Sequence, residues 1–147
     1  MIYPQRMKAD MPDDFVLFLI GMRINKPLHV HRWLPVARAM PRMLTELVQQ
    51  PELGLLHADA WYGRTMIILQ YWRSLELLHA YARSKERQHL PAWRAFQQAS
   101  DGNPAVGIWH ECYEIKDGSH SNVYVNMPLF GLGKAIGNYV PANHKRQ

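Results

Sequence analysis

One unbroken segment, residues 61–82 (WYGRTMIILQYWRSLELLHAYA), most constrains how this chain can fold. Gly63 supplies the backbone freedom that a tight reversal between two strands requires. The run that follows, TMIILQYW, is β-branched, aromatic and aliphatic, which is typical of a strand covered on both faces. Ser74 then suits the N-cap of a helix, and Glu76 faces the positive end of that helix dipole. The segment therefore predicts a β-hairpin that leads directly into a helix.

The rest of the chain predicts further strands and helices around this hairpin. The apolar spacing within residues 32–50 predicts a helix, which Pro41 is expected to kink or break at Met40. Hydrophobic runs bounded by turn residues predict the strands. The predicted strands are residues 15–24, 55–62, 65–73, 106–116 and 122–127. The order is β-α-β-β-α-β with an extra C-terminal strand, so we expect an α+β, ferredoxin-like fold.

A single structured domain is expected, flanked by two shorter segments. Residues 1–14 are polar with two prolines, and we interpret them as an N-terminal arm. Residues 15–127 form the predicted domain, and residues 128–147 a glycine-rich, basic C-terminal tail. A length of 147 residues is ordinary for one domain with a buried core.

Two predicted strands are apolar on both faces, which bears on assembly. Residues 15–24 alternate apolar side chains on both sides, and the strand over residues 106–116 places Trp109 and Tyr113 on one face and Cys112 on the other. Helices in a ferredoxin-like fold cover one face of the sheet only. A second copy of the chain is the simplest cover for the other face, which predicts a homodimeric α/β barrel.

Composition narrows the classes of partner. The net charge is +5, but the basic residues are scattered and form no nucleic-acid motif, so we disfavour nucleic acid. The longest apolar run has eight residues, far below the roughly 20 that a membrane-spanning helix needs. No secretory signal is recognisable, and a single cysteine, Cys112, suits a reducing compartment. We expect a cytoplasmic protein that does not contact a membrane.

Four segments together resemble a known family. They are RTMIILQYWRSLELLHAYAR, HLPAWRAF, GIWHECY and YVNMPLFGLGKA. In this order they resemble a small bacterial and fungal family long filed as a domain of unknown function and described as monooxygenase-like. The resemblance extends from about residue 21 to residue 135 and implies the dimeric α/β barrel superfamily. Relatives there include cofactor-free antibiotic-biosynthesis monooxygenases and haem-dependent aldoxime dehydratases.

The resemblance implies a monooxygenase-like oxidoreductase that acts on a hydrophobic small molecule between sheet and helices, without a cofactor. Two alternatives stay open. One is a haem-binding enzyme with chemistry like that of the aldoxime dehydratases. The other is a non-catalytic small-molecule-binding or interaction dimer, because this superfold hosts unrelated functions.

Three residues are candidates for handling protons. His89 precedes Pro91 in a segment similar to the one that leads to a pocket histidine in the dehydratases, and it is a candidate acid, base or haem ligand. A helix-terminal histidine that caps carbonyl groups is the alternative. His110 and Glu111 are adjacent in a predicted strand, so one faces the pocket and the other the dimer interface. Either can instead be a satisfied polar group in the core.

Five residues are candidates for binding the substrate. Four aromatic side chains are expected to line a cavity for a flat apolar molecule, and a buried amide needs hydrogen-bond partners that a substrate can supply. For the aromatic residues, packing in the core or in the dimer interface is the competing interpretation. The five candidates are Trp72, Asn126, Tyr124, Tyr71 and Trp109.

Three other signals are interpreted as structural. His29 and His31 lack a third ligand at a recognisable spacing, so no metal site is predicted. Gly131-x-Gly133 lacks the strand–helix context of a dinucleotide loop and predicts a turn. Cys112 has no activating partner in the sequence and is interpreted as buried packing.

Overall fold

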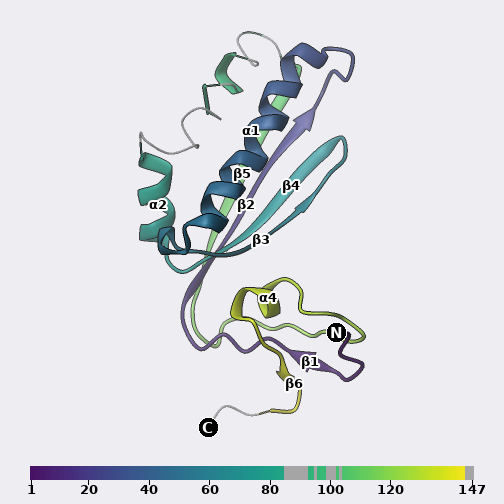
Figure 1. Cartoon of the computed structure of the whole chain (residues 1–147), viewed down its shortest axis with the longest axis vertical. Coiled ribbons are helices and arrows are strands. Elements are labelled where there is room, and N and C mark those ends of the chain that lie inside the picture. The colour runs from purple at the N-terminus through teal and green to yellow at the C-terminus, as the bar shows by residue number, and fades with distance from the viewer. Residues whose placement is uncertain (85–92, 95, 99–101, 103, 145–147) are drawn as a thin grey trace.

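The structure, a computed structural model, describes residues 1–84, 93–94, 96–98, 102 and 104–144. Most of its helices and strands belong to one sheet and the helices that cover it (Figure 1). In chain order the elements are β1 (Met7–Lys8), β2 (Phe15–Ile24), α1 (Val30–Gln49), the short 3-10 helix η1 (Pro51–Leu53), β3 (Leu55–Trp61), β4 (Thr65–Trp72), α2 (Leu75–Arg83), β5 (Val106–Ile115), α4 (Leu132–Ile136) and β6 (Val140–Pro141).

The central sheet has four antiparallel strands in the order β3-β4-β2-β5. β2 is an inner strand, and its register places Phe18 opposite Cys112 and Ile20 opposite His110 on β5. α1 connects β2 to β3, and α2 follows β4 on the way to β5. This arrangement is the ferredoxin-like β-α-β-β-α-β fold, so the predicted α+β fold class is confirmed.

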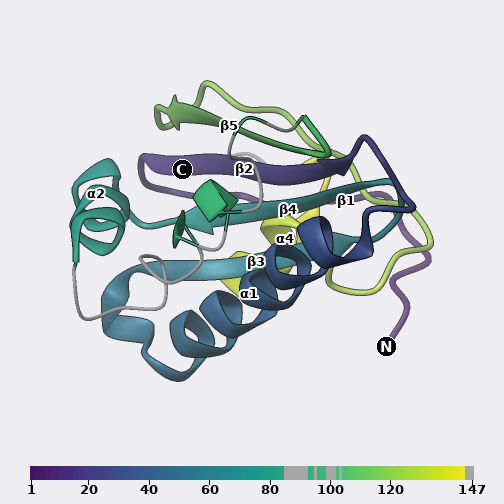
Figure 2. The ribbon, with the colours of Figure 1, turned by 90° about the horizontal axis from the view of Figure 1, so that it is seen from above.

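α1 and α2 cover one face of the sheet (Figure 2). A buried hydrophobic cluster joins the two helices to β2, β3 and β4, and its members are Val16, Met43, Leu47, Leu55, Trp72, Leu78 and Tyr81. Trp72 is fully buried, and its indole N–H donates a hydrogen bond of 2.7 Å to the side-chain oxygen of Gln70. The buried amide of Gln70 is thereby paired within the core.

The start of α2 follows the sequence prediction. The hydroxyl oxygen of Ser74 accepts a hydrogen bond of 3.2 Å from the backbone N–H of Leu77, as expected of an N-cap. Glu76 lies in the first turn, near the positive end of the helix dipole.

The expected break at Met40 is not observed, because α1 continues through Pro41 to Gln49. Pro41 has no N–H to donate to the carbonyl group of Ala37 one turn earlier, so the helix lacks one hydrogen bond there. Val36, Met43 and Leu47 are buried on either side of it, and their packing holds both halves of the helix against the sheet. Tertiary packing outweighs the local preference of proline here.

The two terminal segments pair with each other beside the end of the sheet (Figure 1). β1 and β6 are antiparallel, with Met7 opposite Pro141, and Tyr3 forms a further bridge with Met127. A second hydrophobic cluster closes this layer and includes Met7, Ala9, Met11, Phe15, Leu132 and Tyr139. The domain boundaries at residues 14 and 127 stay a prediction.

Residues 122–127, which are predicted to form a strand, do not form one in the sheet. This segment adds no strand to the four-stranded sheet and instead contacts the N-terminal residues through isolated bridges at Tyr124 and Met127. Asn126 has a φ of 55°, a left-handed conformation that interrupts an extended strand. Alternation of residue types in the sequence gave no sign of this interruption.

The opposite face of the sheet carries apolar side chains. Alternation along the paired strands places Leu17, Leu19, Ile67, Leu69, Trp109 and Tyr113 on this side. The indole of Trp109 lies close against β2 at Gly21, where a Cβ atom would come within 2.6 Å of its nitrogen.

None of the helices in the described part of the chain combines the length and the apolar character that a membrane span requires.

Gly133 permits the closest contact in the terminal layer. A Cβ atom at this position would collide with the ring of Tyr139, whose hydroxyl donates to the carbonyl of Pro128 at 2.9 Å. The packing of the Tyr139 ring therefore explains why Gly133 of the Gly131-x-Gly133 motif has no side chain.

Gly133→Ala is expected to lower the free energy of unfolding by about 1–3 kcal/mol, because the new methyl group must displace the Tyr139 ring. Urea unfolding followed by circular dichroism measures this change. Gly63→Ala is the matched control, because Gly63 does not adopt the positive φ that the hairpin was expected to need and the atom nearest to its Cβ would be 3.8 Å away. Equal stability of Gly133→Ala and wild type would contradict the packing role of Gly133.

Candidate active site

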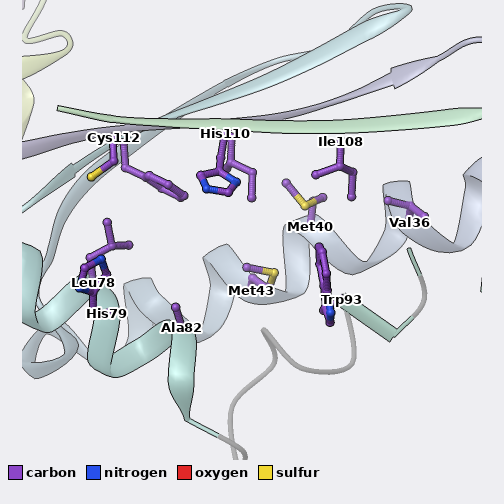
Figure 3. A pocket seen from close by; sticks show the side chains of 12 residues that line it. Val36, Met40, Met43, Leu78, His79, Ala82, Trp93, Ile108, His110 and Cys112 are labelled. Carbon is purple, nitrogen blue, oxygen red and sulfur yellow. The ribbon is translucent and has the colours of Figure 1, made fainter. Parts of the chain in front are cut away.

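A cavity of about 470 Å³ lies between the sheet and the helices (Figure 3). Its walls come from β2, β5, α1 and α2, and Trp93 closes one side. A volume of this size is within the range of small-molecule sites. The lining residues are Phe18, Ile20, Val36, Met40, Met43, Leu78, His79, Ala82, Trp93, Ile108, His110 and Cys112.

Strand alternation explains which side chains of β5 reach this cavity. Ile108, His110 and Cys112 are spaced two apart, so all three point to the helix side of the sheet. Their partners on β2 in the register are Met22, Ile20 and Phe18. The pairing of β2 and β5 therefore fixes the sheet wall of the cavity.

His110 projects into the cavity from β5 (Figure 3). Its ring lies 5.8 Å from the ring of Phe18, and the residue is exposed. Within the described part of the chain, its imidazole makes no hydrogen bond, so both ring nitrogens are available to a ligand. His110 is thus placed to accept or donate a proton inside the cavity.

His79 also lines the cavity, from α2, and sequence reasoning missed it. Its signal was present: it follows Leu78 directly and lies three residues before Ala82, on the edge of the apolar side of the helix. The cavity therefore has imidazole groups on both its sheet wall and its helix wall. No group of three described residues is arranged to hold a metal ion.

The sequence profile of the family described as monooxygenase af470-like matches residues 15–132. The chain belongs to the monooxygenase af470-like family. It is 31% identical over 130 residues to Monooxygenase af470 of Aspergillus fumigatus. The match covers 81% of this chain and 45% of the fungal protein, so the chain spans less than half the length of that relative.

Solved structures with the same fold are more distant in sequence. SnoaB, a cofactor-independent oxygenase from Streptomyces nogalater, is 12% identical with a TM-score of 0.50, over 70% of this chain and 94% of SnoaB. A dimeric protein of ferredoxin-like fold from Bacteroides fragilis is 11% identical with a TM-score of 0.50, over 69% of this chain and 96% of its own. These likenesses concern the fold alone. The haem alternative gains no support from these relatives.

Of the eight predicted site residues, His110 lines the cavity of this af470-like chain, and His89 lies outside the described residues. Glu111 and Trp109 are on the opposite face of the sheet. Glu111 accepts a hydrogen bond of 2.8 Å from the hydroxyl of Tyr113, and the charge of Glu111 raises the pKa of that tyrosine. The strand thus separates His110 from Glu111, as alternation requires.

The other four candidates lie away from the cavity. Trp72 belongs to the buried core cluster. Tyr71 and Tyr124 pack against the terminal cluster, with their hydroxyls near the backbone amide of Leu132 at the start of α4. Asn126, two residues beyond Tyr124, is exposed. Burial raises the pKa of Tyr71 to about 12, so its hydroxyl stays protonated at neutral pH.

Cys112 differs from its predicted role as buried packing. It is exposed, and its thiol lines the cavity two residues from His110. β5 is an edge strand of the sheet, which leaves this part of the strand accessible. Partial loss of water around the thiol where it faces the cavity, helped by the charge of Glu114, raises the pKa of Cys112 above the ordinary value.

Cys112 is expected to react with iodoacetamide more slowly at pH 7 than a small thiol of ordinary pKa, a cysteine peptide with blocked termini, because the thiolate is the reactive form and the pKa of Cys112 is raised. The rate should increase only through a pH range above that of an ordinary thiol. Intact-protein mass spectrometry measures it directly, since the chain has one cysteine. A rate at pH 7 equal to that of the small thiol would contradict the raised pKa.

Proposed function

We propose that this chain is a monooxygenase-like oxidoreductase that acts on a hydrophobic aromatic small molecule in the cavity between sheet and helices, with dioxygen and without a cofactor. The observation that carries the proposal is a largely apolar cavity into which the imidazole of His110 projects. Family membership and the fold shared with a cofactor-independent oxygenase support it. The proposal does not depend on the substrates of the much longer fungal relative.

His110 acts as the base in the proposed reaction. It accepts the proton of a phenolic hydroxyl, and the electron-rich phenolate then gives one electron to dioxygen. The two radicals combine at a ring carbon, which forms a C–O bond. His110 returns its proton to the resulting peroxide. The ring carbon then loses its hydrogen as a proton while the O–O bond breaks, so that one oxygen atom stays as a new carbonyl group and the other leaves as hydroxide, which takes up that proton to become water.

The reaction balances without a reductant. A phenol and O₂ give a quinone and H₂O, so the substrate supplies all four electrons that dioxygen accepts. The protein has three tasks in this scheme: to hold the ring, to exclude water from the radical pair and to move one proton. An apolar cavity with few polar groups suits these tasks.

His110→Ala is expected to lower kcat/KM for oxygen consumption by about a hundredfold or more, the usual contribution of a positioned general base. An oxygen electrode with a panel of naphthols and hydroquinones measures it on the purified chain. His31→Ala is the matched control, because His31 is exposed on α1 and does not line the cavity.

Three outcomes separate the functions considered. Oxygen consumption that survives His110→Ala but is lost in His89→Ala would transfer the base to His89. Saturable binding of the panel without oxygen consumption would favour a non-catalytic binder. A Soret band on addition of haem that shifts in His110→Ala would favour a haem protein.

We also propose that the chain forms a homodimer through the opposite face of the sheet. The support is the set of apolar side chains there, including Leu19, Leu69 and Trp109, and the dimeric protein that shares this fold. A face-to-face arrangement would remove these side chains from water and leave both cavities on the outer, helix-covered sides.

Leu69→Glu is expected to convert the dimer to a monomer, because the new carboxylate would be buried in the interface directly opposite the carboxylate of Asp59 on β3. Light scattering after size-exclusion chromatography measures the mass. Val48→Glu on α1, where the side chain is 68% exposed, should leave the dimer intact. A wild-type protein with the mass of one chain would refute the homodimer.

A further inference from the structure

We propose that the cavity is polar at one end and apolar at the other, and that it therefore binds an uncharged, elongated molecule with one polar head in a single direction. This inference rests on the proposed function only for the identity of the head as a phenol. The direction of binding follows from the lining of the cavity alone and can be measured without turnover.

The long axis of the cavity runs along β5. Ile108, His110 and Cys112 succeed one another on its sheet wall (Figure 3). Four residues of strand separate the first from the last, which is about 13 Å at the usual rise. This length suits two or three rings in a row.

The polar end of the cavity lies next to α2. Cys112 and His79 line this end from opposite walls, beside Leu78, and His110 follows on the sheet wall (Figure 3). Cys112 pairs with Phe18 of β2, whose side chain packs against the core cluster that contains Leu78. A hydroxyl group of a ligand at this end can both donate hydrogen bonds to and accept them from imidazole groups.

The apolar end lies at the other end of the strand segment. Ile108 faces Val36 and Trp93 there, and Met40 lies between the two ends (Figure 3). Val36 is 1% exposed and packs in a cluster with Met22 and Val106, against which Ile108 also packs. A polar group placed between Ile108 and Val36 would lose its water without gaining a partner, because the indole nitrogen of Trp93 points away from them (Figure 3).

No acidic, lysine or arginine side chain lines the cavity among the described residues. A carboxylate or phosphate at the apolar end would therefore lie among side chains that include no described cation to pair with it, which is costly. The apolar end of the cavity accordingly selects neutral groups. His79, on α2, becomes a specificity-determining residue that holds the head at the polar end.

Three biphenyls of the same shape test the inference: 4-hydroxybiphenyl, 4,4′-dihydroxybiphenyl and 4′-hydroxybiphenyl-4-carboxylate. Isothermal titration calorimetry on the full chain measures their affinities. We expect 4-hydroxybiphenyl to bind most tightly. A second hydroxyl at the apolar end should weaken binding about tenfold, and a carboxylate by more.

Substitutions at Ile108 and His79 test which residues form the apolar end and the polar end of the cavity. Ile108→Thr should bring the affinity for the diol closer to that for the mono-hydroxyl compound, because it supplies a hydroxyl partner at the apolar end. His79→Leu should weaken binding of 4-hydroxybiphenyl about fivefold and leave unsubstituted biphenyl unaffected, and His79→Gln should restore part of the loss. His31→Leu on the surface of α1 should change nothing, and thermal melts confirm that each variant is folded.

Several outcomes overturn the proposed direction of binding. They are equal affinity for the three compounds, no detectable binding of any of them, or an equal effect of His79→Leu on biphenyl and on its hydroxyl derivative. Oxygen consumption is scored separately. If the three compounds bind with the expected pattern but no oxygen is consumed, the monooxygenase is refuted and the proposed direction of binding stands. If oxygen is consumed but the compounds do not bind with this pattern, the proposed direction is refuted and the monooxygenase stands.

Discussion

The pairing of β2 with its two neighbours is the constraint on which the rest of the structure depends. β2 is hydrogen-bonded to β4 on one side and to β5 on the other, and both faces of the strand are apolar. A slip of one residue between β2 and β5 would turn every side chain of β5 to the other face. Glu111 and Trp109 would then enter the cavity, and His110 would leave it. The register thus decides the chemistry of the cavity as well as the stability of the sheet.

The order of elements was readable from local signals, whereas the position of the site was not. The hairpin at Gly63, the Ser74 N-cap and the succession of the first four predicted strands follow from turn chemistry and apolar spacing over short distances, and the structure has all three. The fifth predicted strand, over residues 122–127, is absent from the sheet. Alternation also required His110 and Glu111 to face opposite ways. Alternation does not say which of these two side chains points toward the helices, because that depends on the register of β5 with β2, which lies about 90 residues away in the chain.

The terminal layer shows a second limit of local reasoning. Tyr71 and Tyr124 are predicted to bind substrate because aromatic side chains can line a cavity for a flat apolar molecule, yet they pack against the segment around Leu132. The pairing of β1 with β6 joins the two ends of the chain, which no local pattern announces. In retrospect the pair Gly131 and Gly133 was the available signal. Glycines this close together often mark a place where another part of the chain comes near the backbone, here the ring of Tyr139 against Gly133.

The two faces of the sheet have different proposed roles: one lines the cavity and the other forms the contact between two copies of the chain. A cavity needs a gap in the packing, and one forms because α1 and α2 pack together on β2, β3 and β4 but leave the edge strand β5 partly uncovered. The other face keeps large apolar side chains close together, with Gly21 letting the indole of Trp109 lie against the strand. Filling that face with a second copy would rigidify β2 and β5 from behind. Because His110 and Cys112 sit on β5, the same contact would hold the sheet wall of the cavity in place, so assembly and binding are expected to be coupled through one strand.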